Sequence, residues 1–169
     1  MKKIKYLLIL LTILILITGC SSSNESKLLR SVKNTSITEN GLKSYRAKVS
    51  IVNNDKKINY IVLNKENKDY KLIDGNNEYN YKDTDKYLNI LKKVENIKVS
   101  DIKIDKIEYK KYDFTIDKEI INSVLKDFNI KVKDNGTGYA YIDQDDHVYI
   151  INYVFDDLTI NVSYTRLNK

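Results

Sequence analysis

Of the residue types that occur only once in this sequence, two have side chains that could support specific chemistry: Cys20 and His147. Cys20 follows three lysines near the start and an apolar run of 13 residues, Tyr6 to Thr18. A basic start, a short apolar run and small residues at its exit are the layout of a secretory signal, and a membrane-spanning helix needs about 20 residues. A lone cysteine in an exported chain has no partner for an internal disulfide, so its thiol needs another fate.

Residues 17–20, Ile-Thr-Gly-Cys, resemble the lipobox of bacterial lipoproteins. In that family the cysteine sulfur receives a diacylglyceryl group, and cleavage makes the cysteine the new N-terminus. The resemblance implies a removed signal at 1–19, lipid attachment at Cys20 and a location on the extracytoplasmic face of the cell membrane. The small polar residues that follow predict a flexible tether, so that 20–27 comprise the lipidated cysteine and the tether. Two acyl chains give stable attachment, whereas one gives reversible binding. The alternative is a chance thiol after an ordinary secretory signal.

His147 lies beside the acidic segment Asp143-Gln144-Asp145-Asp146, which raises the question of a metal site. The segment does not fit a calcium-binding EF-hand loop, because Val148 stands where the invariant glycine belongs and no glutamate follows at the twelfth position. One histidine without further ligands is also poor for zinc. We therefore expect an acidic hairpin turn without a metal, and we interpret Asp156-Asp157 in the same way.

Catalytic motifs are missing from the sequence. It contains no glycine-rich phosphate loop, nucleophile elbow, Ser-Lys pair or Cys-His pair. None of the many carboxylates stands in an apolar surround that would raise its pKa for acid–base work. We expect no cofactor, and an enzyme is the third choice after a ligand binder and an interaction module.

Length and charge narrow the class further. Removal of 19 residues leaves 169 − 19 = 150, the size of one domain. The net charge of +6 includes three signal lysines, so the mature chain carries +3. Lysines alternate with acidic residues instead of forming a basic stripe, and we therefore expect no nucleic-acid partner.

The apolar periodicity predicts one α+β domain over residues 28–169. A short helix is expected around Leu28, and four strands with period-two alternation follow, beginning with Tyr45, Ala47, Val49 and Ile51. A helix over 87–94 precedes strands up to Ile116, with phase slips near 105–106 and 110–111 that predict a turn or a bulge. Asp117 caps the strongest helix, whose apolar stripe is Ile120, Ile121, Val124, Leu125 and Phe128. A short strand at 130–132 and two or three more from Tyr139 complete an antiparallel sheet.

This layout resembles the LolA/LppX-like lipoproteins. The resemblance rests on the entry Gly41-Leu42-Lys43-Ser44-Tyr45 into a meander and on the late hairpin that starts with Tyr139-Ala140-Tyr141-Ile142-Asp143. It implies a strongly curved, unclosed β half-barrel with about three helices on its concave face. Members of that superfamily bind lipids, lipoproteins or glycolipids in the cavity, and some act as adaptors for protein partners.

A half-barrel of this kind would offer a concave apolar site with a few hydroxyl groups for orientation. We expect ten residues to line it: Tyr45, Val49, Tyr60, Val62, Tyr79, Tyr81, Leu88, Leu91, Ile121 and Leu125. The first hypothesis is thus a membrane-anchored binder of a lipid or other apolar ligand. The same residues could instead pack against the helices as core, although the stripe on the helix after Asp117 could also line an open groove. The second hypothesis is a tethered interaction module for an envelope or cell-wall enzyme, which an exposed patch or an open sheet edge would favour.

Overall fold

The computed structural model describes residues 23–36, 44–54, 56–65, 68–73, 76–79 and 85–166 of the chain. Nine strands in this part form one antiparallel sheet in the order β4-β3-β2-β1-β9-β8-β7-β6-β5. The strands are β1 (Ser44–Asn53), β2 (Lys56–Lys65), β3 (Lys68–Ile73), β4 (Asn76–Tyr79), β5 (Glu95–Ile104), β6 (Ile107–Ile116), β7 (Gly136–Ile142), β8 (Val148–Phe155) and β9 (Leu158–Arg166). The chain order therefore places the first and last long strands side by side at the centre.

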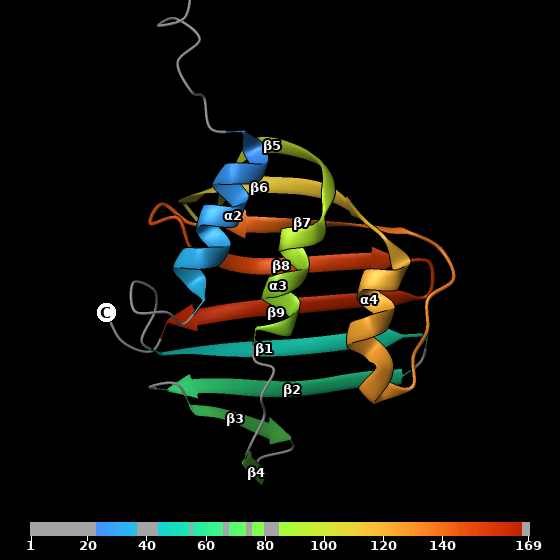
Figure 1. Cartoon of the computed structure of the whole chain (residues 1–169). Coiled ribbons are helices and arrows are strands. Elements are labelled where there is room, and N and C mark those ends of the chain that lie inside the picture. The colour runs from blue at the N-terminus through green and yellow to red at the C-terminus, as the bar shows by residue number, and fades with distance from the viewer. Residues whose placement is uncertain are drawn as a thin grey trace, which may run out of the picture.

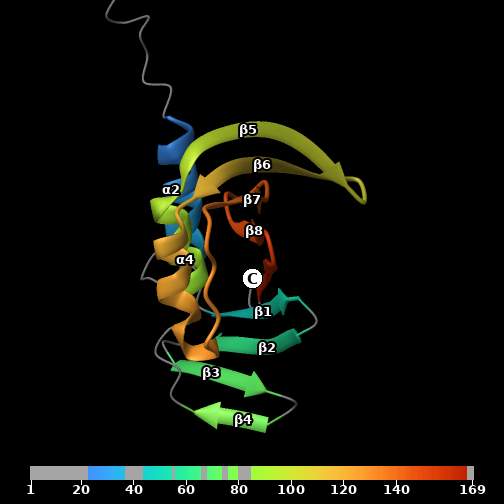
Figure 2. The same ribbon diagram turned by 90° about the vertical axis from the view of Figure 1, so that its right-hand side faces the viewer.

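The three α-helices of the described residues lie across one face of the curved, unclosed sheet (Figure 1). They are α2 (Asn24–Thr35), α3 (Lys86–Ile90) with the 3₁₀ turn η1 (Leu91–Lys93), and α4 (Lys118–Leu125) with the 3₁₀ turn η2 (Lys126–Phe128). In the side view the helices form a single layer and the β5–β6 hairpin arches away from it (Figure 2). The predicted α+β half-barrel architecture is confirmed.

The apolar positions of the period-two pattern in β1 lie on the face of the sheet that the helices cover. In β1, Tyr45, Ala47, Val49 and Ile51 are buried, while the residues between them are exposed or half-buried. The register extends this face across the sheet, because Val49 lies opposite Tyr60 of β2 and Val162 of β9. Cross-strand neighbours share a face, so the helical layer covers one continuous apolar surface.

The first helix starts earlier than the sequence predicted. Ser23 caps α2 through its hydroxyl, which accepts a hydrogen bond of 3.1 Å from the backbone N–H of Ser26. Asn24 to Lys27, which we assigned to the flexible tether 20–27, are therefore helical. The Ser23 hydroxyl satisfies one of the free N–H groups of the first turn, which is the reason serine favours the position before a helix.

The predicted slip near Lys110 and Lys111 is not a bulge. The pairing of β6 with β5 and with β7 runs through these residues without a shift. Tyr112 faces the helices, whereas Tyr109 faces the opposite side and stacks on Tyr149 with ring centroids 5.1 Å apart. The other slip, at Asp105-Lys106, is the β5–β6 turn, where both residues have positive φ. In β6 the buried side chains thus change from the face opposite the helices, at Tyr109, to the helix-covered face, from Tyr112 onward.

The short strand predicted at 130–132 is also absent. The backbone of Val132 pairs with a side chain, that of Asn122, instead of with another strand. The amide oxygen of Asn122 accepts a hydrogen bond of 2.8 Å from the N–H of Val132, and its Nδ2 donates to the carbonyl of Val132 at 3.1 Å. Asn122 lies on α4, so the extended segment docks on a helix.

No described helix is long and apolar enough to cross a bilayer.

Candidate functional site

Eight of the ten predicted ligand residues lie in the core between the sheet and the helices. Each has at most 4% of its surface exposed: Tyr45, Val49, Tyr60, Val62, Leu88, Leu91, Ile121 and Leu125. The side chain of Tyr79 and all of Tyr81 lie outside the described residues. The structure therefore brings the eight together: four lie on the inner face of β1 and β2, and four belong to α3, η1 and α4, which cover that face.

Tyrosine hydroxyls of the inner face hold α3 against the sheet. The phenolic oxygens of Tyr60 and Tyr87 are 2.6 Å apart, and Tyr153 donates to the backbone carbonyl of Tyr87 at 2.7 Å. Tyr45 donates to a carboxylate oxygen of Asp85 at 2.6 Å. Of the hydroxyls that we expected to orient a ligand, those of Tyr45 and Tyr60 are thus engaged in fixing a helix.

An open groove lies on the outer side of the same helices. It has a volume of about 340 Å³ and runs between α3–η1 and α4–η2. Its lining combines apolar with charged and polar side chains: Lys86, Asn89, Ile90, Lys93, Ile120, Ser123, Val124, Lys126 and Asp127. Ligand pockets typically measure about 300–1,000 Å³, so the groove is at the small end of that range.

The wide apolar stripe of α4 explains why this groove exists. Ile121 and Leu125 are fully buried against the sheet, while Ile120 and Val124 are half-buried. Residues one apart on a helix point about 100° away from each other, so a stripe this wide extends past the core. Its outer half, together with the buried Ile90 of α3, contributes the apolar part of the groove.

Lys86 places a positive charge in the wall of the groove. Its side chain is 5% exposed, and its Nζ lies 3.5 Å from a carboxylate oxygen of Asp127. The same Nζ lies 5.4 Å from the ring centroid of Tyr87 and 5.2 Å from that of Phe128. Aromatic faces attract cations at such distances. In the sequence, Lys86 and Lys93 lie off the apolar face of the helix predicted around 87–94, and we expected no lysine to line a ligand site. Their seven-residue spacing was a signal that they share a helix face.

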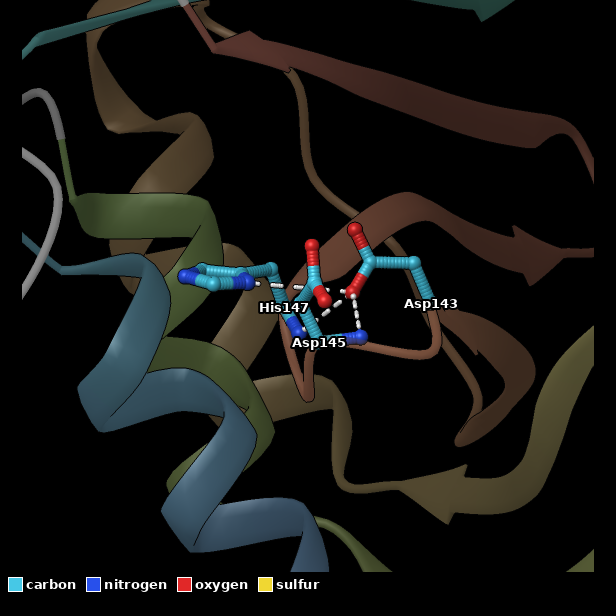
Figure 3. A group of neighbouring side chains, drawn as sticks. All are labelled: Asp143, Asp145 and His147. Atoms are coloured by element: carbon cyan, nitrogen blue, oxygen red, sulfur yellow. Dashed lines mark hydrogen bonds and ion pairs between the residues drawn. The ribbon is translucent and has the colours of Figure 1, made fainter. Parts of the chain in front are cut away.

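The acidic turn between β7 and β8 contains the second group of chemically interesting side chains. Asp143, Asp145 and His147 each offer a possible metal ligand atom, and these atoms lie within 4.8 Å of one another (Figure 3). One oxygen of Asp143 accepts hydrogen bonds from the N–H of Asp145 at 3.0 Å and the N–H of His147 at 2.9 Å. This carboxylate therefore organises the turn itself.

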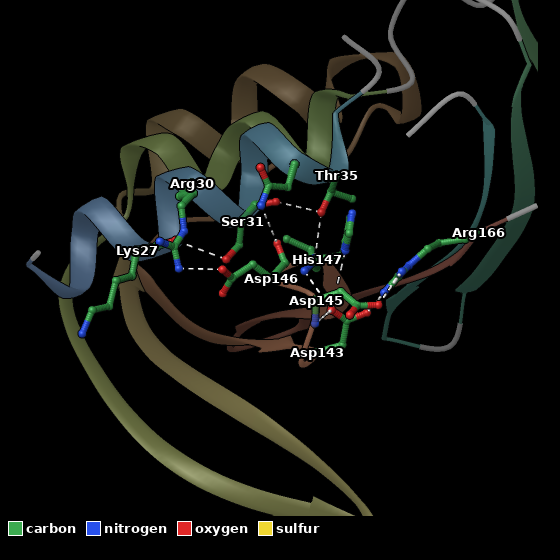
Figure 4. Close-up of polar contacts among 11 residues, drawn as sticks. Lys27, Arg30, Ser31, Thr35, Asp143, Asp145, Asp146, His147 and Arg166 are labelled. Atoms are coloured by element: carbon green, nitrogen blue, oxygen red, sulfur yellow. Dashed lines mark hydrogen bonds and ion pairs between the residues drawn. The ribbon is translucent and has the colours of Figure 1, made fainter. Parts of the chain in front are cut away.

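Two carboxylates of the turn form salt bridges with an arginine side chain of the same chain. Arg166, at the end of β9, pairs with Asp143 and, at 2.9 Å, with Asp145 (Figure 4). The turn also contacts α2, because Arg30 pairs with Asp146 at 2.6 Å. The cluster thus connects β7, β8, β9 and α2, which supports the interpretation of a structural turn.

Comparison with known proteins gives a likeness in structure. No protein-family model matches the sequence, and no curated protein matches it by sequence. The crystal structure of LprF from Mycobacterium bovis is similar with a TM-score of 0.54 and 12% identity, covering 86% of this chain and 93% of that chain. The lipoprotein LppX of Mycobacterium tuberculosis is similar with a TM-score of 0.52 and 15% identity, covering 86% of this chain and 96% of that chain. At these identities the likeness shows the fold, and the predicted resemblance to the LolA/LppX-like fold is confirmed.

Proposed function

We propose that this chain is an extracytoplasmic lipoprotein, anchored through Cys20, whose domain binds a lipid or another apolar-chain ligand. The observation that carries the proposal is the α3–α4 groove, where apolar side chains lie beside charged ones in a fold shared with a mycobacterial lipoprotein. A molecule with an apolar chain and a polar head matches both parts of this lining. We propose no catalytic step.

The apolar side chains of the groove would bind the apolar chain of the ligand. Ile120 and Val124 are half-buried and present aliphatic surface that water now covers in part, beside the buried Ile90. Covering apolar surface is worth about 25 cal/mol per Å² removed from water, so even a small groove can give measurable affinity. The eight core residues expected from the sequence fill the interface between these helices and the sheet, and a longer chain would reach them only if α3 and α4 moved.

The short connection to the proposed anchor fits such a ligand. Helix α2 begins at Asn24 with Ser23 as its cap, so only residues 21–23 separate the proposed lipidated cysteine from the first helix. An extended chain spans about 3.3–3.6 Å per residue. The start of α2 would therefore stay within about 15 Å of the anchored cysteine, which keeps the domain next to the bilayer.

Native mass spectrometry of residues 21–169, purified gently from cells, tests the ligand. A bound lipid at stoichiometric level, confirmed by extraction, is the expected result. A ligand-free mass that persists after incubation with membrane lipids would contradict lipid binding. The anchor has its own test: the full-length protein should partition into detergent with an added diacylglyceryl mass, and Cys20→Ser should lose both properties.

A second function, a tethered module for an envelope protein, is favoured by the opposite face of the sheet. Four tyrosines cluster there, with ring centroids 4.9–6.2 Å apart: Tyr109, Tyr139, Tyr141 and Tyr149. Tyr149 is 39% exposed, and Val154 and Ile107 are also exposed large apolar residues. Chemical crosslinking in cells, compared between the native chain and Tyr149→Ser, tests for a partner on this face.

A further inference from the structure

We propose that the α3–α4 groove prefers an amphiphile with one apolar chain and an anionic headgroup. This inference rests on the proposed function, because it assumes that the groove accepts an apolar chain. It goes further in stating the charge of the headgroup and the number of chains.

The charge of the lining is the first argument. Lys86, Lys93 and Lys126 line the groove with one acidic residue, Asp127, so the formal charge is 3 − 1 = +2. The mature chain as a whole carries +3, from 29 − 3 = 26 basic and 23 acidic residues. Positive charge is therefore concentrated at this groove, and a concave site lined by one sign of charge attracts ligands of the opposite sign.

The burial of Lys86 is the second argument. Its ammonium group is held within the protein, where charges interact more strongly than in water. Asp127, its partner at 3.5 Å, is 72% exposed, so this carboxylate is largely hydrated. An anionic headgroup at the groove would add oxygen acceptors on the open side, and the exposed Lys93 and Lys126 would approach it from the rim.

The remaining polar lining suits the same ligand. The Asn89 side chain can donate hydrogen bonds to an anionic headgroup. The Ser123 hydroxyl donates its one proton to the carbonyl of Ile120 at 2.7 Å and would have to rotate to donate to a ligand. The volume of about 340 Å³ suits one chain better than two. A fatty carboxylate, an alkyl phosphate and a single-chain phospholipid share this chemistry.

The test uses residues 21–169 and calorimetric titration with two probes below their critical micelle concentrations. Dodecyl phosphate is anionic, and dodecyl phosphocholine has the same chain with a zwitterionic head. We expect dodecyl phosphate to bind about tenfold more tightly at low salt, and the difference to shrink as salt is added. Equal affinities would overturn the charge preference and leave the proposed function standing. Binding of neither probe would overturn the groove as the ligand site.

Paired variants separate the groove from the overall charge. Lys93→Gln with Lys126→Gln should reduce the tenfold preference to less than about threefold. The control, Lys92→Gln with Lys103→Gln, removes the same charge from exposed residues outside the groove lining and should keep the preference. Equal loss in both pairs would overturn the inference. Inorganic phosphate should fail to compete, since it has no chain; competition as strong as that of dodecyl phosphate would also overturn the inference.

Discussion

The hydroxyl of Thr35 accepts a hydrogen bond of 2.7 Å from the backbone N–H of Val148 and donates one of 2.8 Å to the carbonyl of Ser31. Thr35 ends α2 and Val148 starts β8, 113 residues later in the chain. Both residues are buried. One side chain therefore satisfies the first N–H of a central strand and joins the N-terminal helix to the sheet.

Thr35→Val should lower the free energy of unfolding by about 1–3 kcal/mol, because it leaves the N–H of Val148 buried without its acceptor. Urea denaturation followed by circular dichroism measures the change. Thr35→Ser is the matched control, since it keeps the hydroxyl and loses only a methyl group. Equal losses in the two variants would show that packing, and not the hydrogen bond, matters at this position.

Gly138 allows β7 to pack under an aromatic ring. A Cβ atom added there would lie 2.4 Å from the backbone oxygen of Asn152 and 2.5 Å from the ring of Phe114. Gly138→Ala should therefore destabilise the domain by about 1–3 kcal/mol through overpacking. Thr137→Ala, at the exposed neighbouring position, should cost much less. A stable Gly138→Ala variant would mean that β7 and β8 can separate easily.

Buried tyrosines should make the stability depend on alkaline pH. Burial raises the pKa of Tyr153 and of Tyr164 well above the ordinary value of 10.0. Above pH 10 the unfolded chain loses phenolic protons that the folded chain retains, so stability is full below that pH and falls above it. Each tyrosine contributes up to about 1.4 kcal/mol per pH unit.

Tyr164→Phe tests this pH dependence directly. The hydroxyl of Tyr164 is buried and has no hydrogen-bond partner among the residues with described positions, so its removal should cost little at pH 7. Urea unfolding between pH 8 and pH 11 should then show a shallower alkaline loss than in the native chain. An unchanged slope would assign the loss to other groups.

Arg166 should keep the acidic turn from depending on a metal ion. Because it pairs with both Asp143 and Asp145, we expect calcium, zinc and EDTA to leave the Tm unchanged. Arg166→Gln should lower the free energy of unfolding by about 1–3 kcal/mol, since these hydrogen bonds are charge-assisted and partly buried. Arg30→Gln, which removes the more exposed pair with Asp146, should cost about 1 kcal/mol or less. Stabilisation of the native chain by calcium would contradict this account.

The sequence predicted the central strands well because their pattern is local. Alternation in β1 identifies the buried face residue by residue, and Asp117 marks the start of α4, where its carboxylate accepts a hydrogen bond of 2.7 Å from the N–H of Glu119. The same pattern failed at Tyr109, because period two cannot tell which of two faces has a covering layer. It failed at Val132 because the hydrogen-bond partner there is the side chain of Asn122, ten residues earlier.

The candidate site was harder to predict for a related reason. The stripe on α4 showed that both Ile120 and Ile121 were apolar, and a groove was one of the alternatives for it. Which of them lies in the core and which lines the groove depends on the position of α3, about 30 residues away in sequence. Such non-local packing has no signal in a single sequence. The lysines of the groove were visible only as charges on the polar side of a helix.

The last prediction distinguishes the groove from the inner face as the place where a chain binds. Val124 contributes to the groove and is half-buried, whereas Ile121 is fully buried. Val124→Asn should weaken the binding of dodecyl phosphate by about 5- to 30-fold, from the loss of about 1–2 kcal/mol of apolar contact. Ile121→Ala should instead cost about 2–5 kcal/mol of stability and leave the affinity of the folded domain unchanged.

Calorimetric titration and urea denaturation of both variants check the two halves of this prediction. Titrations of Ile121→Ala are made where denaturation shows the variant to be folded, so that a loss of folding is not mistaken for a loss of binding. A change in affinity of more than about threefold in Ile121→Ala, about 0.65 kcal/mol, would place the chain against the inner face. The ligand would then contact the residues that the sequence predicted, and α3 and α4 would have to separate from the sheet to admit it.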